Sequence, residues 1–559
     1  MKVGEMHAKL LRVFKKYGVL FPLYYFIHKC DHTIARIYRK KLTNHTLYVN
    51  NNFKLNALKH SPSLDFIEKT IISNYYELAY NLTDPKCRWE RNRLQKYLSE
   101  IVHNQDDHPT VAKRVINRIK NDDTYSETNA MEISIRLINI LLLFNNSSAF
   151  LPYSLLIEKE CKNNVAYILN NLECGIKYSS NHYFFNLIGI IIYLQSIKTK
   201  GIFDKLINWY YDNKLGYYLK KSINKDGSFF EGSTHYHKYV HQSLLLLCCL
   251  RPDLVDTRIG RQLQLLDSFT SFIKLGNTYV SIGDNDSGYV IRRSYITQIK
   301  NYNYVFDALK LGKLSVTRRN KISKLNKNSS KSFGLLHLKN AKWEAFMRHD
   351  NSVKNHYRKV IGKHCHNDQQ HILLSCFGIP VIVSKGTYSY LPYHQFRYKT
   401  ISGSTHNGVY IRGFEQGRIN MDWNEIEHKI TSNILNDSHD CLSTIVTYRK
   451  ISCIRTIKYD LEQFMITDKV SSSDEHNGIS SQCLFILNPL ISINKSNERN
   501  IQLSYNKLKI QVSINSDHWR LVDTKIYNEY SHIQSSRGIL LVQTINNSIA
   551  EFSINFKIC

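Results

Sequence analysis

The chain has 559 residues, of which 43% are hydrophobic and 12% aromatic, so it is long enough for roughly two to four domains and too apolar for a globally disordered protein. Its formal net charge of +29 favours a polyanionic partner, which leaves nucleic acid, anionic lipid, acidic polysaccharide or a mere compositional bias toward basic residues. The sequence has no basic low-complexity tail, zinc finger or other nucleic-acid motif, so we expect no nucleic acid. The twelve scattered cysteines form no CxxC pair, which indicates free thiols in a reducing compartment.

Residues 1–50 are predicted to form a basic amphipathic extension. Its apolar run, Val19 to Ile27, is short, is interrupted by Pro22 and precedes no small-residue cleavage site. We therefore expect neither a signal peptide nor a membrane span. Two alternatives remain: a helix packed on the body of the protein, or peripheral membrane contact through residues 1–40. The expected location is the cytoplasm, with membrane-surface association as the alternative.

Residues 51–312 show helical periodicity. Apolar residues recur at three-to-four spacing, as in Ile133, Leu137 and Leu141. Similar runs lie near 64–80, 153–171, 183–196, 203–219, 237–250 and 260–275, separated by Asn, Asp, Ser or Gly. Consecutive helices with short loops predict antiparallel hairpins, arranged as a toroid or as a solenoid.

The period changes near residue 330. Residues 313–331 are basic, polar and aperiodic, which predicts a linker. Residues 332–559 contain short β-rich runs with a period of two, beginning with the alternation of Leu335 and His337 with Leu336 and Leu338. Many strands without intervening helices predict a large antiparallel β-sandwich.

Candidate chemical groups gather in two distant regions. The first holds Asn181, His182, Glu231, Tyr236 and His237, and the second runs from His364 through Tyr388 to His406. Imidazoles, phenols and carboxylates transfer protons or bind metal near neutral pH. Each has a structural alternative: Asn181 is a helix cap, and the His364-x-His366 pair lies on one face of a strand. The segment from Gly283 to Gly288 predicts a turn better than a calcium loop.

Taken in order, these segments resemble one family, the heparinase II/III-type polysaccharide lyases, which also include alginate lyases. No single motif is specific, but their common order is. The motifs are Trp89-Glu-Arg-Asn-Arg93, Glu132-x-Ser134-x-Arg136-x-x-Asn139, Asn181-His182-x-x-x-Asn186-x-x-Gly189, Asp226 to His237, Gly283-Asp284, His364-x-His366-x-Asp368, Gly386-Thr-Tyr388 and Thr405-His406-Asn407.

The resemblance implies an N-terminal incomplete (α/α) toroid followed by a C-terminal antiparallel β-sandwich, with the active cleft between them. It implies β-elimination on a glycan that contains uronic acid: a base removes the C5 proton and an acid protonates the departing O4. The expected catalytic residues are Asn181 and His182, which would neutralise the uronate carboxylate, with Tyr236 as acid or as both acid and base, and His364 as second base. Expected substrate-binding residues are Arg88, Arg93, Arg136, Glu231, His237, Tyr388 and Arg397.

One position departs from the family pattern. Members with a structural metal hold it with two histidines, which correspond to His366 and His406, and an aspartate, which is Ser384 here. Asp368 is an alternative third ligand. We expect no required cofactor, and at most a structural divalent metal such as zinc.

Two other functions stay open. A uronyl C5-epimerase shares the proton-abstraction step and leaves the C4–O4 bond intact. A catalytically silent glycan-binding protein is the alternative outside enzymes. An intracellular member would suit oligosaccharide processing or bacterial surface-polysaccharide metabolism.

Overall fold

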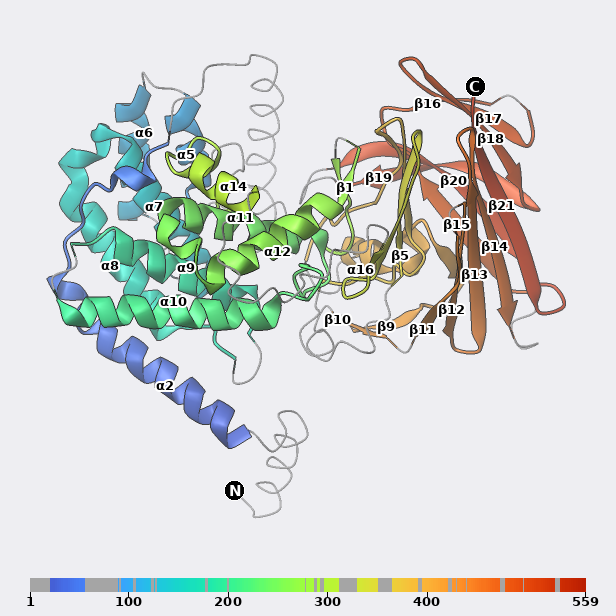
Figure 1. Ribbon diagram of the computed structural model, residues 1–559. Helices are drawn as coiled ribbons and strands as arrows, with labels where there is room; N and C mark the ends of the chain where they lie inside the picture. Colours follow the sequence, from blue (N-terminus) through green and yellow to red (C-terminus); the bar gives the residue numbers. More distant parts are fainter. Residues whose placement is uncertain are drawn as a thin grey trace. The chain divides into compact units, whose positions relative to one another are not determined.

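The computed structural model describes residues 21–55, 89, 92–103, 107–121, 125, 128–175, 179–198, 201–276, 278–285, 289–291, 296–310, 329–349, 364–390, 395–420, 425–428, 430–438, 440–472, 478–495, 497–527 and 533–559 (Figure 1). The chain forms two compact units. The helical unit comprises residues 1–222, 239–264 and 288–317, and the strand-rich unit comprises residues 223–238, 265–287 and 318–559.

The helical unit confirms the helical periodicity of the sequence. The predicted run at 64–80 lies outside the described residues. The described helices of this unit are α2 Phe21–Arg39, α5 Gln95–His103, α6 His108–Asn121, α7 Ala130–Asn146, α8 Ser154–Asn170, α9 Asn181–Gln195, α10 Ile202–Ser222, α11 Thr234–Leu250, α12 Arg258–Phe272 and α14 Tyr302–Lys310. The residues of α11 and α12 are divided between the two units. Short 3-10 turns are Leu42–Asn44, Asn51–Phe53, Ser148–Tyr153 and Pro252–Leu254.

Helices α7 and α9 form the centre of this unit. Every residue of α7 from Ala130 to Asn145 is buried. At the crossing of the two helices, Gly189 lies so close to Ser134 that a Cβ at Gly189 would stand 3.0 Å from the Ser134 Cβ. The Glu-x-Ser and Asn-x-x-Gly motifs therefore include the small residues that let these helices approach closely.

The N-terminal helix α2 packs on α8. It also contacts α10, because Asp31 accepts a hydrogen bond from Tyr210 and lies 2.5 Å from the Lys214 ammonium. Ala35 and Tyr38 of α2 are fully buried. This agrees with the packed-helix alternative for this segment, and residues 1–20 lie outside the described residues.

No single described helix combines the length and apolarity that a membrane crossing needs. One bent pair, Ala130–Asn146 with Ser148–Asn170, meets the length and composition criteria jointly, with a bend of 119°.

The strand-rich unit contains antiparallel sheets, as the two-residue period predicted. Its strands are β1 Lys274–Leu275, β2 Thr278–Tyr279, β3 Ser329–Ser330, β4 Leu335–Lys339, β5 Trp343–Arg348, β6 Ile372–Cys376, β7 Ile379–Ile382, β8 Val409–Ile411, β9 Gly417–Asn420, β10 Glu425–His428, β11 Thr431–Asp437, β12 Cys441–Tyr448, β13 Ile451–Tyr459, β14 Gln463–Ser472, β15 Ser480–Ile486, β16 Ser492–Lys495, β17 Asn500–Tyr505, β18 Leu508–Asn515, β19 His518–Ile526, β20 Gln534–Thr544 and β21 Ile549–Ile558.

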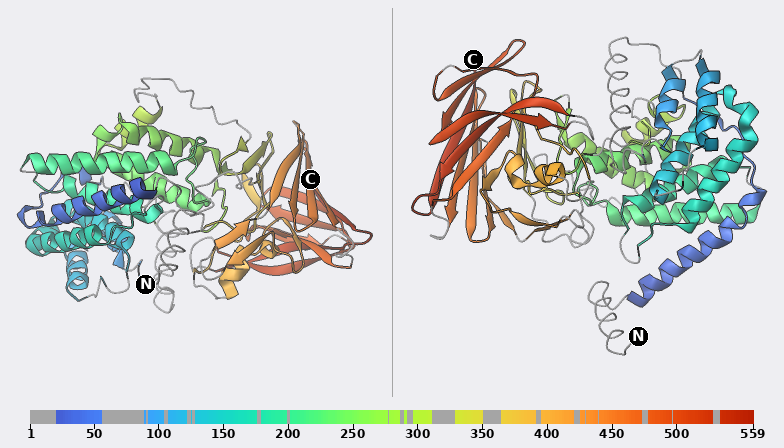
Figure 2. Two further views of the ribbon diagram at one scale, coloured as in Figure 1. Left: turned by 90° about the horizontal axis from the view of Figure 1, so that it is seen from below. Right: turned by 180° about the vertical axis from the view of Figure 1, so that it is seen from behind.

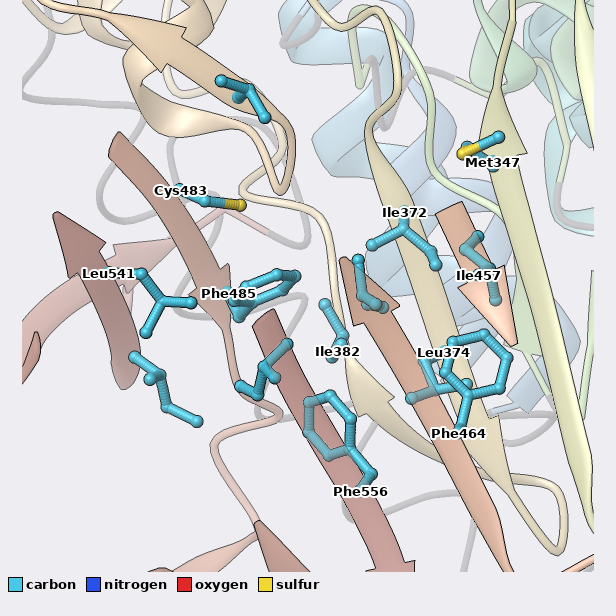
Figure 3. Close-up of a cluster of buried hydrophobic side chains, with 14 of the residues drawn as sticks. Met347, Ile372, Leu374, Ile382, Ile457, Phe464, Cys483, Phe485, Leu541 and Phe556 are labelled. Carbon is cyan, nitrogen blue, oxygen red and sulfur yellow. The ribbon is translucent and has the colours of Figure 1, made fainter. Parts of the chain in front are cut away.

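The sheets form a sandwich. An eight-stranded sheet has the order β11-β12-β13-β14-β21-β18-β17-β16, and Figure 2 shows its strands side by side from two further directions. Sheets β3-β4-β5-β6-β7 and β19-β20-β15-β8 make up the rest, together with the small pairs β1-β2 and β9-β10. A bridge between Ile382 and Leu487 joins the five-stranded and four-stranded sheets. One hydrophobic core contains side chains from all three larger sheets, including Leu374, Phe464 and Leu541 (Figure 3).

The alternation in β4 and β5 explains a second core. Leu336 and Met347 point into the sandwich, whereas Leu335 and Phe346 pack on the other face of the sheet against Phe269 and its neighbours. The end of α12 and the β1-β2 hairpin therefore belong to the strand-rich unit, although the sequence placed residues 51–312 in one helical domain. Of the predicted linker, residues 313–328 lie outside the described residues, while Ser329–Ser330 form β3.

Candidate active site

Four segments of the strand-rich unit meet through hydrogen bonds of their backbone N–H groups. The Thr234 N–H at the start of α11 donates to the Ile282 carbonyl at 3.1 Å, and the Asp284 N–H donates to the His364 carbonyl at 2.9 Å. Gly283 makes this approach possible: its φ is +70°, and a Cβ there would stand 2.4 Å from the His364 oxygen. Thr387 joins the group by accepting a 3.1 Å hydrogen bond from the Asn285 N–H.

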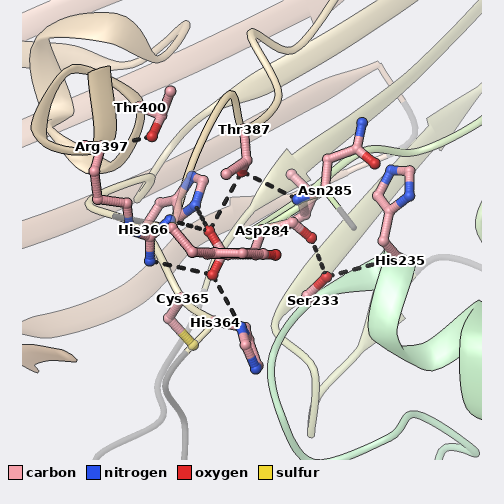
Figure 4. A network of polar contacts seen from close by, with 12 residues as sticks. Ser233, His235, Asp284, Asn285, His364, Cys365, His366, Thr387, Arg397 and Thr400 are labelled. Carbon is pink, nitrogen blue, oxygen red and sulfur yellow. Dashed lines mark hydrogen bonds and ion pairs between the residues drawn. The ribbon is translucent and has the colours of Figure 1, made fainter. Parts of the chain in front are cut away.

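The Asp284 carboxylate is the centre of this arrangement (Figure 4). It accepts hydrogen bonds from His364 Nδ1 at 2.9 Å and from His366 Nε2 at 2.8 Å. Arg397, on helix α16 (Gln395–Ile401), donates to both of its oxygens, at 3.2 Å to Oδ2. The Thr387 hydroxyl adds a bond of 3.3 Å. Asp284 and Arg397 are fully buried, so their charges are compensated within the protein.

These contacts indicate the tautomer of a neutral His364. Burial by itself would raise the pKa of Asp284, but Arg397 and the hydrogen bonds from His364 and His366 hold that pKa well below its usual range. An ionised carboxylate can only accept, so His364 Nδ1 must carry a proton. In neutral His364 the Nε2 lone pair is then free to take a proton, which is the property a general base needs.

Tyr236 stacks on this histidine. The two ring centroids lie 3.7 Å apart with an angle of 16° between the planes. The Tyr236 hydroxyl donates to the Tyr390 hydroxyl at 3.4 Å, and the Arg397 guanidinium lies 5.2 Å from the centroid of the Tyr390 ring. A phenol and an imidazole thus stand face to face, where the ring would stabilise a positive charge that forms on His364.

The first turn of α11 positions Tyr236. Ser233 precedes this helix, and its hydroxyl accepts hydrogen bonds from the N–H groups of His235 at 3.1 Å and Tyr236 at 3.3 Å, as an N-cap residue does. The same hydroxyl donates to the Asp284 carbonyl at 2.5 Å. Ser233 therefore fixes the position of the Tyr236 backbone relative to the segment that bears Asp284.

In the helical unit, Asn181 and His182 begin α9. The N-cap is Ser180, whose hydroxyl accepts from the His182 N–H, so Asn181 is not the cap that the sequence offered as an alternative. His182 Nδ1 lies 2.6 Å from Glu173 Oε1. The other oxygen of Glu173 accepts from the Met131 N–H, which ties the His182 ring to the start of α7.

The predicted substrate-binding arginines have different surroundings. Arg88 lies outside the described residues. Arg93 forms a two-point ion pair with Glu132, Arg136 pairs with Glu160 at 3.1 Å, and Arg397 pairs with Asp284; all three side chains are buried. These ion pairs occupy part of each guanidinium, and a role in substrate binding stays a prediction for all three arginines.

The remaining predicted residues lie in the strand-rich unit. His237 is fully buried between the Phe229 N–H and the Thr270 hydroxyl. Glu231 is also buried, and the Tyr388 ring lies 5.3 Å from that of Tyr527. A role in substrate binding stays a prediction for Glu231, His237 and Tyr388.

The side chains at the predicted metal position do not fit a bound metal. His366 already donates to Asp284, and the rings of His366 and His406 are 5.2 Å apart at their centroids. Asp368, the alternative ligand, lies 3.4 Å from Arg348 instead. Within the described ranges, no three His, Cys, Asp or Glu side chains are arranged to hold a metal ion.

Sequence reasoning missed two carboxylates that orient the histidines. Asp284 belongs to a motif that the sequence assigned to a turn, and Glu173 belongs to none. The available indication for Asp284 was its place directly after Gly283, because a glycine at a turn often allows a close approach of two backbone segments. Nothing local distinguishes Glu173, because its partners lie nine and 42 residues away.

Comparisons with known proteins agree with this fold. The family model described as Heparinase II/III-like, C-terminal matches residues 326–545. A crystal structure of heparinase III is similar with a TM-score of 0.60 and 12% identity, over 84% of this chain and 76% of that one. A second heparinase III has a TM-score of 0.56 and 15% identity, over 86% and 80%. The heparan sulfate lyase HepC from Pedobacter heparinus has a TM-score of 0.50 and 13% identity, over 86% and 77%. No curated protein sequence matches the chain.

The resemblance to the heparinase II/III-type family is therefore confirmed, by sequence over residues 326–545 and by fold over most of the chain. The predicted fold class, an (α/α) toroid followed by an antiparallel β-sandwich, is confirmed as well. The solved structures that share this fold are described as heparinase III and as a heparan sulfate lyase.

Proposed function

We propose that this protein cleaves an acidic glycan containing uronic acid by β-elimination. The observation that supports it best is the face-to-face pair of Tyr236 and His364, in which Asp284 orients the imidazole. Elimination needs a base for the C5 proton and an acid for the O4 leaving group, and these two side chains supply both kinds of group.

The proposed steps follow from the chemistry of the uronate. Its ionised carboxylate makes the C5 proton hard to remove, because removal adds negative charge to the same group. Asn181 and His182 are the proposed donors that neutralise this carboxylate and stabilise the enediolate. His364 Nε2 or the Tyr236 phenolate takes the C5 proton, depending on which face carries it. Tyr236 then protonates O4 as the C4–O4 bond breaks and the C4–C5 double bond forms.

A panel of acidic polysaccharides, monitored by the ultraviolet absorbance of the unsaturated uronate, tests the reaction. With a substrate in hand, Tyr236→Phe is expected to lower kcat by about two to four orders of magnitude, because it removes only the proton-transferring hydroxyl. Substrate binding should be largely kept. Tyr448→Phe is the matched control, since Tyr448 is a buried tyrosine of β12, and it should leave kcat unchanged.

The same assay separates the alternatives. Deuterium entering C5 from heavy water, without chain shortening, would identify an epimerase. Glycan binding without deuterium exchange or cleavage would identify a silent binding protein. Turnover unaffected by Tyr236→Phe would remove Tyr236 from the mechanism.

A further inference from the structure

A second concave site lies within the strand-rich unit. It is a pocket of about 660 Å³ between the segment after β7, helix α16, the loop after β15, and strands β16, β19 and β20. None of the residues that line it belongs to the Tyr236–His364 pair or to the Asp284 contacts.

The charged groups of this pocket are mostly positive. Lys385, Lys399, Lys525 and Arg537 face it, against a single described carboxylate, Asp523. The side chain of Asp523 is 99% exposed and lies 3.9 Å from Arg537, so the ion pair is weak and screened by water. Among the described residues that line the pocket, the cations thus outnumber the carboxylates.

Lys385 is the informative member of this set. Its side chain is half-buried and makes no ion pair with any described carboxylate. Burial, and secondly the charge of Lys399, lower the pKa of Lys385 to about 8. The folded protein therefore keeps a partly desolvated ammonium next to a second cation, an arrangement that a bound anion would stabilise.

The remaining wall is apolar. Leu487, Pro489 and Ile491 line the pocket beside the lysines. A cationic edge with an apolar wall suits an anionic sugar, whose ring offers C–H groups on one face and a carboxylate or sulfate at its edge. A free inorganic anion would use only the cations.

We propose that this pocket binds a carboxylate or sulfate group of an acidic glycan, as a second glycan site apart from the catalytic residues. The proposal rests on the proposed function for its choice of glycan. The chain connects the two places: Lys385 precedes the segment that carries Thr387 and Tyr390, and the Asn285 side chain donates to the Tyr527 carbonyl in the pocket wall at 3.2 Å.

The test is a binding titration of the full chain carrying Tyr236→Phe, so that no probe is consumed. The probes are a sulfated heparin hexasaccharide, an unsulfated hyaluronan hexasaccharide and inorganic sulfate. The first pocket variant is the double substitution Lys385→Met and Lys525→Met. Its control is the double substitution Lys458→Met and Lys509→Met, which removes the same charge from exposed positions on β13 and β18. Lys525→Glu, a change at an exposed position of β19, is the second pocket variant.

The pocket variants should weaken binding of at least one hexasaccharide by about tenfold or more, because they remove charge-assisted contacts. The surface pair should change it by less than about twofold, as expected for screened charges. Equal losses in both pairs, or none in the pocket variants, would overturn the proposal. So would pocket-dependent binding of inorganic sulfate alone. Because the readout is binding, absence of unsaturated product would count against the proposed reaction and leave this result standing.

Discussion

Asp284 connects three basic side chains that come from distant parts of the sequence. His364 lies 80 residues from it and Arg397 lies 113 residues from it. The carboxylate orients the imidazole and compensates the buried guanidinium at the same time. Its removal should therefore affect catalysis and stability together, and the two effects need a control that separates them.

Asp284→Asn is expected to cost about 3–5 kcal/mol of unfolding free energy, because Arg397 loses its buried partner. It should also lower kcat by about 10³–10⁴, because the amide no longer enforces the tautomer of His364. Asp468→Asn is the matched control: it breaks another buried two-point pair, between Asp468 on β14 and Arg455 on β13, at 2.7 Å.

Chemical denaturation and kcat of the folded fraction are the measurements. The control should lose comparable stability and keep its kcat. Equal effects of the two variants on kcat would mean that Asp284 acts only by holding the fold.

Among the helices, the contact of α7 with α9 shows how the family motifs build structure. Glu132 and Arg136 hold buried ion pairs on α7, while Ser134 provides the close contact with Gly189. These motif residues thus take part in the packing of the helices, and the proposed proton-transfer groups come from other motifs.

Two glycine-to-alanine changes test this packing. In Gly189→Ala the new Cβ would stand 3.0 Å from Ser134 Cβ, so the helices must separate, at about 1–3 kcal/mol of unfolding free energy. In Gly216→Ala, on α10, the nearest atom is 3.6 Å away, and the change should stabilise by up to about 1 kcal/mol through helix propensity. Urea denaturation midpoints should shift in opposite directions. An increase in stability for Gly189→Ala would show that the contact between α7 and α9 can accommodate a methyl group.

Across the whole molecule, the charge of +29 is the largest electrostatic feature. A strongly cationic protein attracts an acidic polymer at long range, and salt screens that attraction. The Debye length falls from about 30 Å at 0.01 M salt to about 3 Å at 1 M. We expect KM for the acidic glycan to rise several-fold over this range, with a smaller change in kcat. A neutral salt titration of initial rates measures it, with thermal unfolding as the control for stability. A KM that does not change with salt concentration would mean that the net charge plays no part in attracting the glycan.

The division of the chain into units shows where local patterns stop being informative. Residues 265–287 lie in the helical half of the sequence, yet their apolar side chains pack on β4 and β5. The helix α12 has the same period on both sides of the unit boundary at Leu265, so no pattern marks the point where its partners change.

The amino-acid sequence by itself determined the change from helices to strands, the approximate ranges of several helices, and the residues that carry the family resemblance. Those features depend on hydrophobic spacing and short motifs, which are local. Only the tertiary structure decided that His364 faces Tyr236, that Asp284 bonds His364, His366 and Arg397 at once, and that Arg93 and Arg136 are buried in ion pairs. These pairings join residues far apart in the chain, and their free energies depend on burial and on neighbouring charges, which no short segment of sequence specifies.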